Sequence, residues 1–318
     1  MKNYQTKLLP LVTLTLVCGL GAISSIHAED LGEVSAAARA QTQAQTQPKI
    51  ENERKKAEDQ AKQGLDKDAI AAIEETQKAI KAVAEGKTNE AIAAIERATG
   101  KIDVLTTRNP ATALLPIEVE VEIIDTALPN LAAIRQRAKA AEYAVGEKDY
   151  PTARLLLQGL ASEIRLRSHH LPLATYPTAM KNAARLLDEK KSKEASAVLL
   201  VALNTLVIID RVTPLPLALA QTAINDAQSK REKDKDGAQK LLAYAKYEVE
   251  RAKELGYAGK DSEYASLNKS ISELEKQLKG NENTASAFTR LKEKVAAFFK
   301  RQSESEKKLA AGQQPANF

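Results

Sequence analysis

The stretch Glu85-Gly86-Lys87-Thr88 separates two segments in which aliphatic residues recur every three or four positions. That spacing puts them on one face of a helix, so the sequence predicts two antiparallel helices joined by this turn. The stripes are Ile70, Ile73, Ile80 and Val83 before the turn, and Ile92, Ile95, Ile102 and Leu105 after it.

Two further stretches repeat this turn, Gly146-Glu147-Lys148-Asp149 and Glu189-Lys190-Lys191-Ser192. In each copy a lysine precedes a residue whose side-chain oxygen is suited to cap the next helix, namely Thr88, Asp149 or Ser192. We therefore expect three helical hairpins. A Leu-Pro-aliphatic step follows each one, which predicts a degenerate internal repeat. The steps are Leu115-Pro116-Ile117, Leu171-Pro172-Leu173 and Leu215-Pro216-Leu217.

The composition agrees with packed helices. Of 318 residues, 43% are hydrophobic but only 4% are aromatic, and there is no tryptophan. A core built mainly from Ala, Leu, Ile and Val argues against a glycine-rich nucleotide-binding sheet. The net charge of +5 is small and lysines alternate with glutamates, so the sequence does not predict a nucleic-acid partner.

Three short segments depart from helical periodicity and predict a small β-sheet: 117–124, 163–170 and 206–212. In such a sheet Glu118, Glu120 and Glu122 would face Arg165 and Arg167 across neighbouring strands. The alternative is that all three segments are ends of helices. The predicted fold class is therefore mainly α, with helical-hairpin repeats packed as a bundle, a small sheet and a C-terminal helical hairpin arm.

The first 28 residues are typical of a secretory signal peptide, with Lys2 and Lys7 before an apolar core and cleavage expected near Ala28. A retained anchor helix is the alternative. The only cysteine, Cys18, lies in this segment, so the mature chain would lack thiol chemistry. Residues 29–64 are predicted to form a polar linker followed by a charged, largely solvated helix. We expect an exported, periplasmic protein.

A separate C-terminal unit is predicted over 259–318, with heptad-spaced apolar residues and a break at 280–284. Its second helix carries an apolar face beside several lysines. That face predicts packing on the preceding helix or, alternatively, contact with a membrane surface. It consists of Leu291, Val295, Phe298 and Phe299.

Several strings between residues 66 and 258 resemble the YfdX family of secreted bacterial proteins. They include Leu160-Ala161-Ser162-Glu163-Ile164, Leu171-Pro172-Leu173-Ala174-Thr175-Tyr176-Pro177, Ala202-Leu203-Asn204-Thr205-Leu206-Val207 and Thr213-Pro214-Leu215-Pro216. The resemblance implies a predominantly helical exported domain, here 65–258, from Gram-negative bacteria and associated with stress responses. It implies no established enzymatic activity and supplies no catalytic residues.

The residues themselves predict no catalytic, cofactor or metal site, because phosphate-binding, nucleophile and zinc motifs are missing. A small-ligand or pH-sensing site is predicted near Pro172. Its residues are His169, His170, Tyr176, Asn204 and Thr205. The alternative is that the histidines are simply exposed at a strand end and the other polar groups cap helices.

The leading functional hypothesis is a non-enzymatic periplasmic stress-associated protein, holdase-like or adaptor-like, that self-associates as a homo-oligomer and binds unfolded or partner polypeptides. Acid would neutralise its carboxylates and expose apolar stripes. The alternatives are a small-molecule binder with a pocket near Tyr176 and an envelope-tethered structural protein that contacts the membrane through its C-terminal helix.

Overall fold

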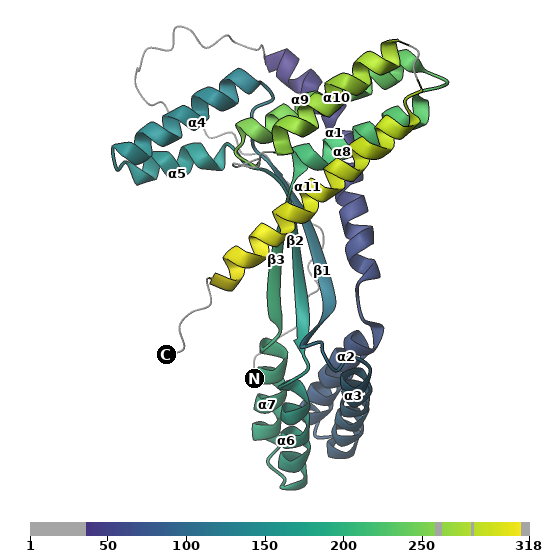
Figure 1. Ribbon diagram of the computed structural model, residues 1–318. Helices are drawn as coiled ribbons and strands as arrows, with labels where there is room; N and C mark the ends of the chain where they lie inside the picture. The colour runs from purple at the N-terminus through teal and green to yellow at the C-terminus, as the bar shows by residue number, and fades with distance from the viewer. Residues whose placement is uncertain (1–35, 258–262, 281–282, 313–318) are drawn as a thin grey trace.

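The structure, a computed structural model, describes residues 36–257, 263–280 and 283–312. The predicted signal peptide and its cleavage point near Ala28 lie outside the described residues. The part of the chain that is described folds into eleven helices and three strands. The sheet forms a stalk between two groups of helices, and a third group projects to one side (Figure 1). The prediction of a mainly α fold with a small sheet is confirmed.

Three consecutive units each consist of a helical hairpin and a strand. They are α2 (Lys67–Ala84), α3 (Thr88–Arg108) and β1 (Leu114–Asp125); α4 (Leu131–Gly146), α5 (Tyr150–Gln158) and β2 (Ser162–Pro172); and α6 (Tyr176–Asp188), α7 (Ser192–Asn204) and β3 (Val207–Pro214). Before them comes α1 (Ala36–Gln63), and after them come α8 (Leu215–Lys230), α9 (Lys235–Glu254), α10 (Glu263–Lys279) and α11 (Ala285–Gly312).

The three predicted hairpin turns share one backbone geometry. Gly86, Lys148 and Lys190 have φ angles of 73°, 62° and 62°, in the left-handed region. In each turn the amide of the next residue donates to a carbonyl five residues back, as when Lys87 N bonds to Ala82 O at 2.9 Å. This is the pattern of a Schellman helix ending, and it reverses the chain with the same geometry each time.

The predicted caps are correct in one turn of three. Asp149 is an N-cap whose side chain accepts from the Thr152 amide. The N-caps of the other two second helices are Lys87 and Lys191, without a side-chain capping bond, so Thr88 and Ser192 are wrong as caps. The prediction took Lys87, Lys148 and Lys191 as equivalent positions of the three turns. In the structure the equivalent positions are the left-handed residues Gly86, Lys148 and Lys190.

The strands form an antiparallel sheet in the order β1-β2-β3. The register places Glu120 opposite Arg167 and Glu122 opposite Arg165, whereas Glu118, the third of the predicted glutamates, lies opposite His169. The ion pairs differ from this cross-strand expectation. Arg167 instead makes two bonds, of 2.8 and 2.9 Å, to Asp210 of β3, and Arg165 pairs with Glu163 at 3.0 Å. The charged side chains of one sheet face are thus paired along β2 and with β3.

Two separate hydrophobic cores lie at the two ends of the sheet. Four helices, α2, α3, α6 and α7, enclose one, and α8, α9, α10 and α11 enclose the other. Leu115 and Leu171 face each other at the first end, whereas Leu215 lies at the other, beyond β3. The hairpin and strand therefore repeat, but the Leu-Pro steps do not occupy equivalent places.

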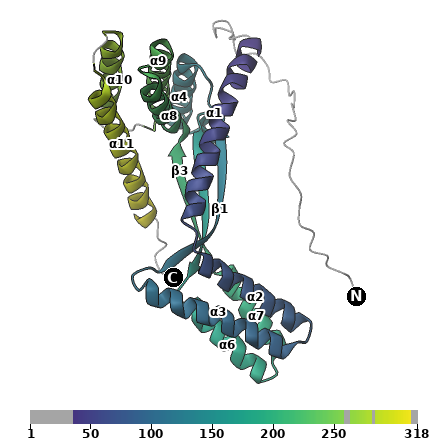
Figure 2. The same cartoon turned by 90° about the vertical axis from the view of Figure 1, so that its right-hand side faces the viewer.

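The predicted charged helix is α1, and it is less solvated than expected. It runs beside β1 (Figure 2) and packs on β1, β2 and α8. Ile50 and Glu53 are buried, at 8% and 7% exposure. Ile50 belongs to a small third core with Ile164 and Leu219.

The C-terminal helices share the second core. Gly256 ends α9 with a φ of 87°, in the left-handed region. Beyond it, α10 packs on α9 and α11 packs on both α10 and α8, so they are integrated with the preceding helices instead of standing free. The predicted domain boundaries themselves stay a prediction.

Candidate functional site

The predicted ligand residues lie where the sheet meets the α2/α3/α6/α7 bundle, but their side chains do not converge. His169 faces Glu118, with 3.7 Å between Nδ1 and the carboxylate. His170 points to the opposite face of β2, where its Nε2 lies 2.8 Å from Ser168 Oγ. Neighbouring residues on a strand alternate sides, which separates the two rings.

The surroundings of the buried His170 alter its pKa. Burial lowers the pKa of His170 below its usual 6.5, and the positive charge of Arg211, then that of His169, lower it further. A proton on His170 is therefore disfavoured in the folded protein. The pH-sensing interpretation of the pair stays a prediction.

Tyr176 lies in the first core, at 1% exposure. Its hydroxyl donates to Thr76 Oγ1 at 2.9 Å, and Thr76 in turn donates to Ala72 O at 2.9 Å. Burial raises the pKa of Tyr176 to about 12. The side chain thus links α6 to α2 inside the bundle.

Asn204 is the last residue of α7, and Thr205 is its C-cap. The Thr205 hydroxyl donates to Ala202 O at 2.7 Å, so it satisfies the end of the helix. Both therefore belong to the end of a helix, as the alternative interpretation of these polar groups expects.

The predicted membrane or partner face is buried in the second core. Leu291, Val295 and Phe298 are 2%, 4% and 2% exposed. The side chain of Phe299 lies outside the described part of the structure. Packing on neighbouring helices thus accounts for the apolar pattern of residues 285–298. None of the described helices is long and apolar enough to cross a membrane.

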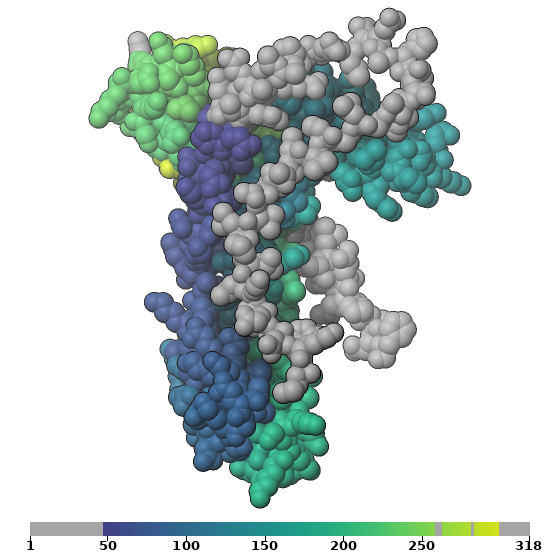
Figure 3. All heavy atoms as spheres, turned by 180° about the vertical axis from the view of Figure 1, so that it is seen from behind, coloured from purple at the N-terminus to yellow at the C-terminus, as the bar shows by residue number. Residues whose placement is uncertain are grey.

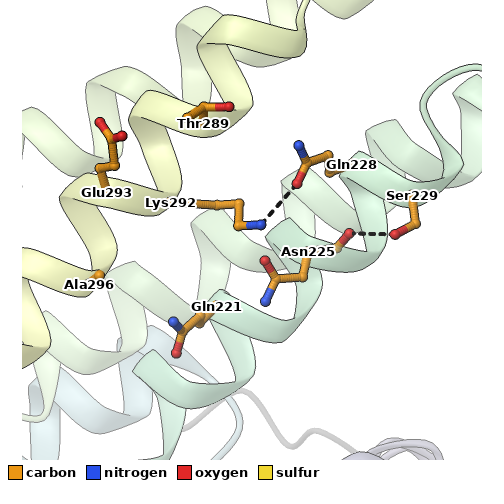
Figure 4. A pocket seen from close by; sticks show the side chains of 8 residues that line it. All are labelled: Gln221, Asn225, Gln228, Ser229, Thr289, Lys292, Glu293 and Ala296. Carbon is orange, nitrogen blue, oxygen red and sulfur yellow. Dashed lines mark hydrogen bonds between the residues drawn. The ribbon is translucent and has the colours of Figure 1, made fainter.

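An open groove of about 550 Å³ runs between α8 and α11 (Figure 4). Its walls are mostly amide and hydroxyl side chains. Lys292 donates to Gln228 Oε1 at 3.1 Å across the groove, and Ser229 donates to Asn225 O along α8 at 3.1 Å. The first of these bonds joins the two helices, and the second lies within α8.

A second cavity, of about 420 Å³, lies between α1, α8 and α9. Leu219, Ala223 and Leu241 supply apolar walls, and Tyr244 lies beside them. Lys49 Nζ sits 3.8 Å from the centre of the Tyr244 ring, a cation–π contact. The Tyr244 hydroxyl is buried, and burial followed by the negative charge of Glu248 raises its pKa.

Another cavity, of about 650 Å³, lies over β2 and β3 and shares Glu53, Lys56 and Thr222 with this one. The Thr222 hydroxyl donates to Glu53 Oε1 at 2.6 Å, and Lys56 Nζ bonds to both, at 3.0 Å to Glu53 and 2.8 Å to Thr222. Sequence patterns did not predict these cavities, because their walls come from α1 and from helices more than 150 residues further along the chain. The described residues contain no group of three or more His, Cys, Asp or Glu placed to hold a metal ion.

Two sets of large apolar side chains are exposed. The first set lies on α4 and α5 and consists of Tyr143, Val145, Tyr150, Leu155 and Leu157, with exposures between 50% and 71%. The α7–β3 surface consists of Leu200, Val201 and Ile208, at 48%, 60% and 55%. Single exposed apolar residues are ordinary, but clustered ones are typical of interaction surfaces.

Known proteins similar to this chain include a solved structure and a protein family. The solved structure is of Salmonella Typhi YfdX, which is 15% identical, with coverage of 48% of this chain and 93% of that one and a TM-score of 0.33. No curated protein matches the chain. The family model described as YfdX protein matches residues 72–212, which run from α2 into β3. The matched part of the chain, residues 72–212 with its three hairpin-and-strand units, belongs to the YfdX family.

Proposed function

We propose that this chain, which contains a YfdX-family region, is a non-enzymatic periplasmic binding protein that holds unfolded or partner polypeptides, as a holdase or an adaptor does. The proposal rests on the outer edge of β3 and on exposed apolar side chains near the start of that strand. They are Leu200 and Val201 of α7 and Ile208 of β3. The periplasmic location rests on the predicted signal peptide.

The edge of β3 suits an extended polypeptide. β3 pairs with β2 on one side only, and no other strand pairs with it among the described residues. An edge strand offers unpaired backbone donors and acceptors, to which an extended segment can add as a further strand. Ile208 and the neighbouring α7 side chains would supply apolar contacts, while the Arg167–Asp210 pair lies beside them on the sheet.

Acid is the expected trigger that loosens the helical bundle. Glu75 of α2 bonds to Arg97 of α3 at 2.7 Å, and its pKa is lowered, first by the bond from Lys78 and then by Arg97. Because the folded pKa is depressed, this contribution to stability is present above the usual 4.5 and is lost as pH falls through the lowered value. Protonation would thus weaken a contact between the two helices.

The test is suppression of client aggregation by the mature chain, followed by light scattering at neutral and acidic pH. We expect suppression to fall when Val201→Lys and Ile208→Lys are combined. Val104→Lys is the matched control, because Val104 is 53% exposed on α3, away from the edge of β3. No suppression by the unaltered protein, or equal suppression by both variants, would rule out the β3 edge as a client site.

A second candidate function is binding of a small amphipathic molecule between α1, α8 and α9. It is favoured by the lysines that surround an apolar wall in which Tyr244 lies. Thermal-shift screening against a panel of apolar carboxylates tests it. A stabilisation that disappears in Tyr244→Ala but persists in Tyr143→Ala, a control 71% exposed on α4, would support it. The same shift in both variants would exclude this cavity.

A further inference from the structure

The two faces of the sheet differ in how their arginines are paired. Arg165 and Arg167 lie on one face, and each forms an ion pair with a carboxylate, at 3.0 and 2.8 Å. Arg211 of β3 stands opposite Leu166 of β2, so the two side chains share the other face of the sheet. Within the described ranges, no carboxylate forms an ion pair with Arg211.

This other face forms the floor of the cavity of about 650 Å³ over β2 and β3. Arg211 and Thr213 of β3 line the floor beside Ile164 and Leu166 of β2. Arg211 is exposed, so a ligand can reach its guanidinium. The floor therefore combines an accessible positive charge with an apolar surface.

Two helices, α1 and α8, form the walls above this floor. Seen from behind, α1 runs along the outside of the stalk (Figure 3). It contributes Ala57 and Ala61 to the lining, one helical turn apart, and α8 contributes Ala218. Because methyl side chains leave space that larger residues would fill, the cavity has room for an alkyl chain beside Leu166. The remaining polar walls are Gln60, Gln221, Thr222 and Asn225.

The other charged residues of the cavity balance each other. Glu53 is the one carboxylate among the described residues that line it. Its Oε1 accepts from the Thr222 hydroxyl at 2.6 Å and pairs with Lys56 Nζ at 3.0 Å. The lining therefore carries a surplus of one positive charge, which is that of Arg211. A guanidinium can donate two parallel hydrogen bonds to a carboxylate or a phosphate, so an anionic group would supply the missing counter-charge.

We propose that this cavity binds an amphiphile whose single anionic headgroup pairs with Arg211, while its alkyl chain lies between Leu166 and the alanines of α1 and α8. The volume falls within the ~300–1,000 Å³ that is usual for small-molecule sites. A compact hydrophilic anion would leave the apolar floor uncovered, and an uncharged amphiphile would leave Arg211 unbalanced. The inference is independent of both candidate functions, because Arg211 lies on the opposite face of β3 from Ile208 and does not line the cavity beside Tyr244.

The test is isothermal titration calorimetry of the mature chain with two decyl anions. Decanoate is the probe for a carboxylate headgroup and decyl phosphate the probe for a phosphate headgroup, and the tighter of the two identifies the headgroup. Decyltrimethylammonium has the same chain with a positive headgroup, and acetate has the carboxylate without the chain; each should bind about tenfold more weakly or not at all. Equally tight binding of either would overturn the proposal, as would no binding of both decyl anions.

Variants locate the bound anion. Arg211→Gln should weaken its binding roughly tenfold or more, because a charge-assisted hydrogen bond is lost. Arg154→Gln, at an exposed arginine of α5, is the matched control and should bind as the unaltered protein does. Ala61→Leu fills the space for the alkyl chain and should weaken binding with the charge intact.

Far-UV circular dichroism shows whether each variant stays folded. Unchanged affinity in Arg211→Gln would overturn the proposal. So would affinity that is lost in Tyr244→Ala but kept in Arg211→Gln, because the anion would then occupy the neighbouring cavity.

Discussion

The hydroxyl pair in the first core offers a stability measurement that separates a structural tyrosine from a ligand-binding one. Tyr176 donates to Thr76 at 2.9 Å, and Thr76 donates onward to Ala72 O. Tyr176→Phe removes one buried hydrogen bond but leaves the onward bond intact, so it should cost about 1 kcal/mol of unfolding free energy. Thr76→Val leaves the Tyr176 hydroxyl buried without a partner, which should cost about 1–3 kcal/mol.

The double substitution removes both groups and should therefore cost less than the sum of the single ones. The difference, the coupling free energy, should be about 1 kcal/mol. Urea unfolding followed by far-UV circular dichroism measures all four proteins, since the chain has no tryptophan to report by fluorescence. Tyr150→Phe, at a tyrosine 60% exposed, is the control and should change nothing.

Alkaline titration gives a second readout of the same group. Burial raises the pKa of Tyr176 from 10.0 to about 12, so the unfolded state ionises first. Its contribution to stability is full below pH 10 and is lost between pH 10 and about 12, and Tyr176→Phe should lack that component. Strictly additive single effects, or a Phe variant of unchanged stability that has lost a ligand, would refute the structural role.

Three further outcomes follow from single side chains. Lys190 has a left-handed backbone, so Lys190→Gly should raise the unfolding free energy by about 0.5–1 kcal/mol, whereas Gly86→Ala, at the left-handed glycine of the first turn, should lower it; thermal unfolding compares the two. Arg251 is buried between two carboxylates, and Arg251→Leu should cost about 3–5 kcal/mol in urea unfolding, because both would lose their partner. The lowered pKa of His170 predicts stability that is full above pH 6.5 and falls as pH drops through that value, and His170→Gln should remove this fall in unfolding measured from pH 8 to 5.

Local patterns predicted the elements well. Helical spacing and turn residues located the α2–α3 hairpin, and strict alternation located β1, because both signals depend on near neighbours in sequence. The N-caps of the helices that follow the hairpin turns were harder to predict. Lys148 takes the left-handed place that glycine takes in the first turn, and only the backbone reveals this shift by one residue.

Contacts between residues far apart in the sequence could not be predicted from such local patterns. Alternation along the strands placed Arg167 opposite Glu120, but the arginine also faces Asp210 on the other neighbouring strand, and that contact depends on the register of β3. The position of Tyr176 in the repeat, fourteen residues before the turn like the buried Ile134, was the available sign that it points into the core. No sequence pattern indicated the cavity beside Tyr244.

The two large hydrophobic cores share no residue and are joined by three strands. Cooperative melting requires that the loss of one part weaken the rest, and here the coupling must pass through the sheet. Scanning calorimetry should therefore resolve more than one heat-absorption peak. The helices at one end of the sheet could then lose their packing while those at the opposite end keep theirs, so a mild stress would yield a half-folded molecule.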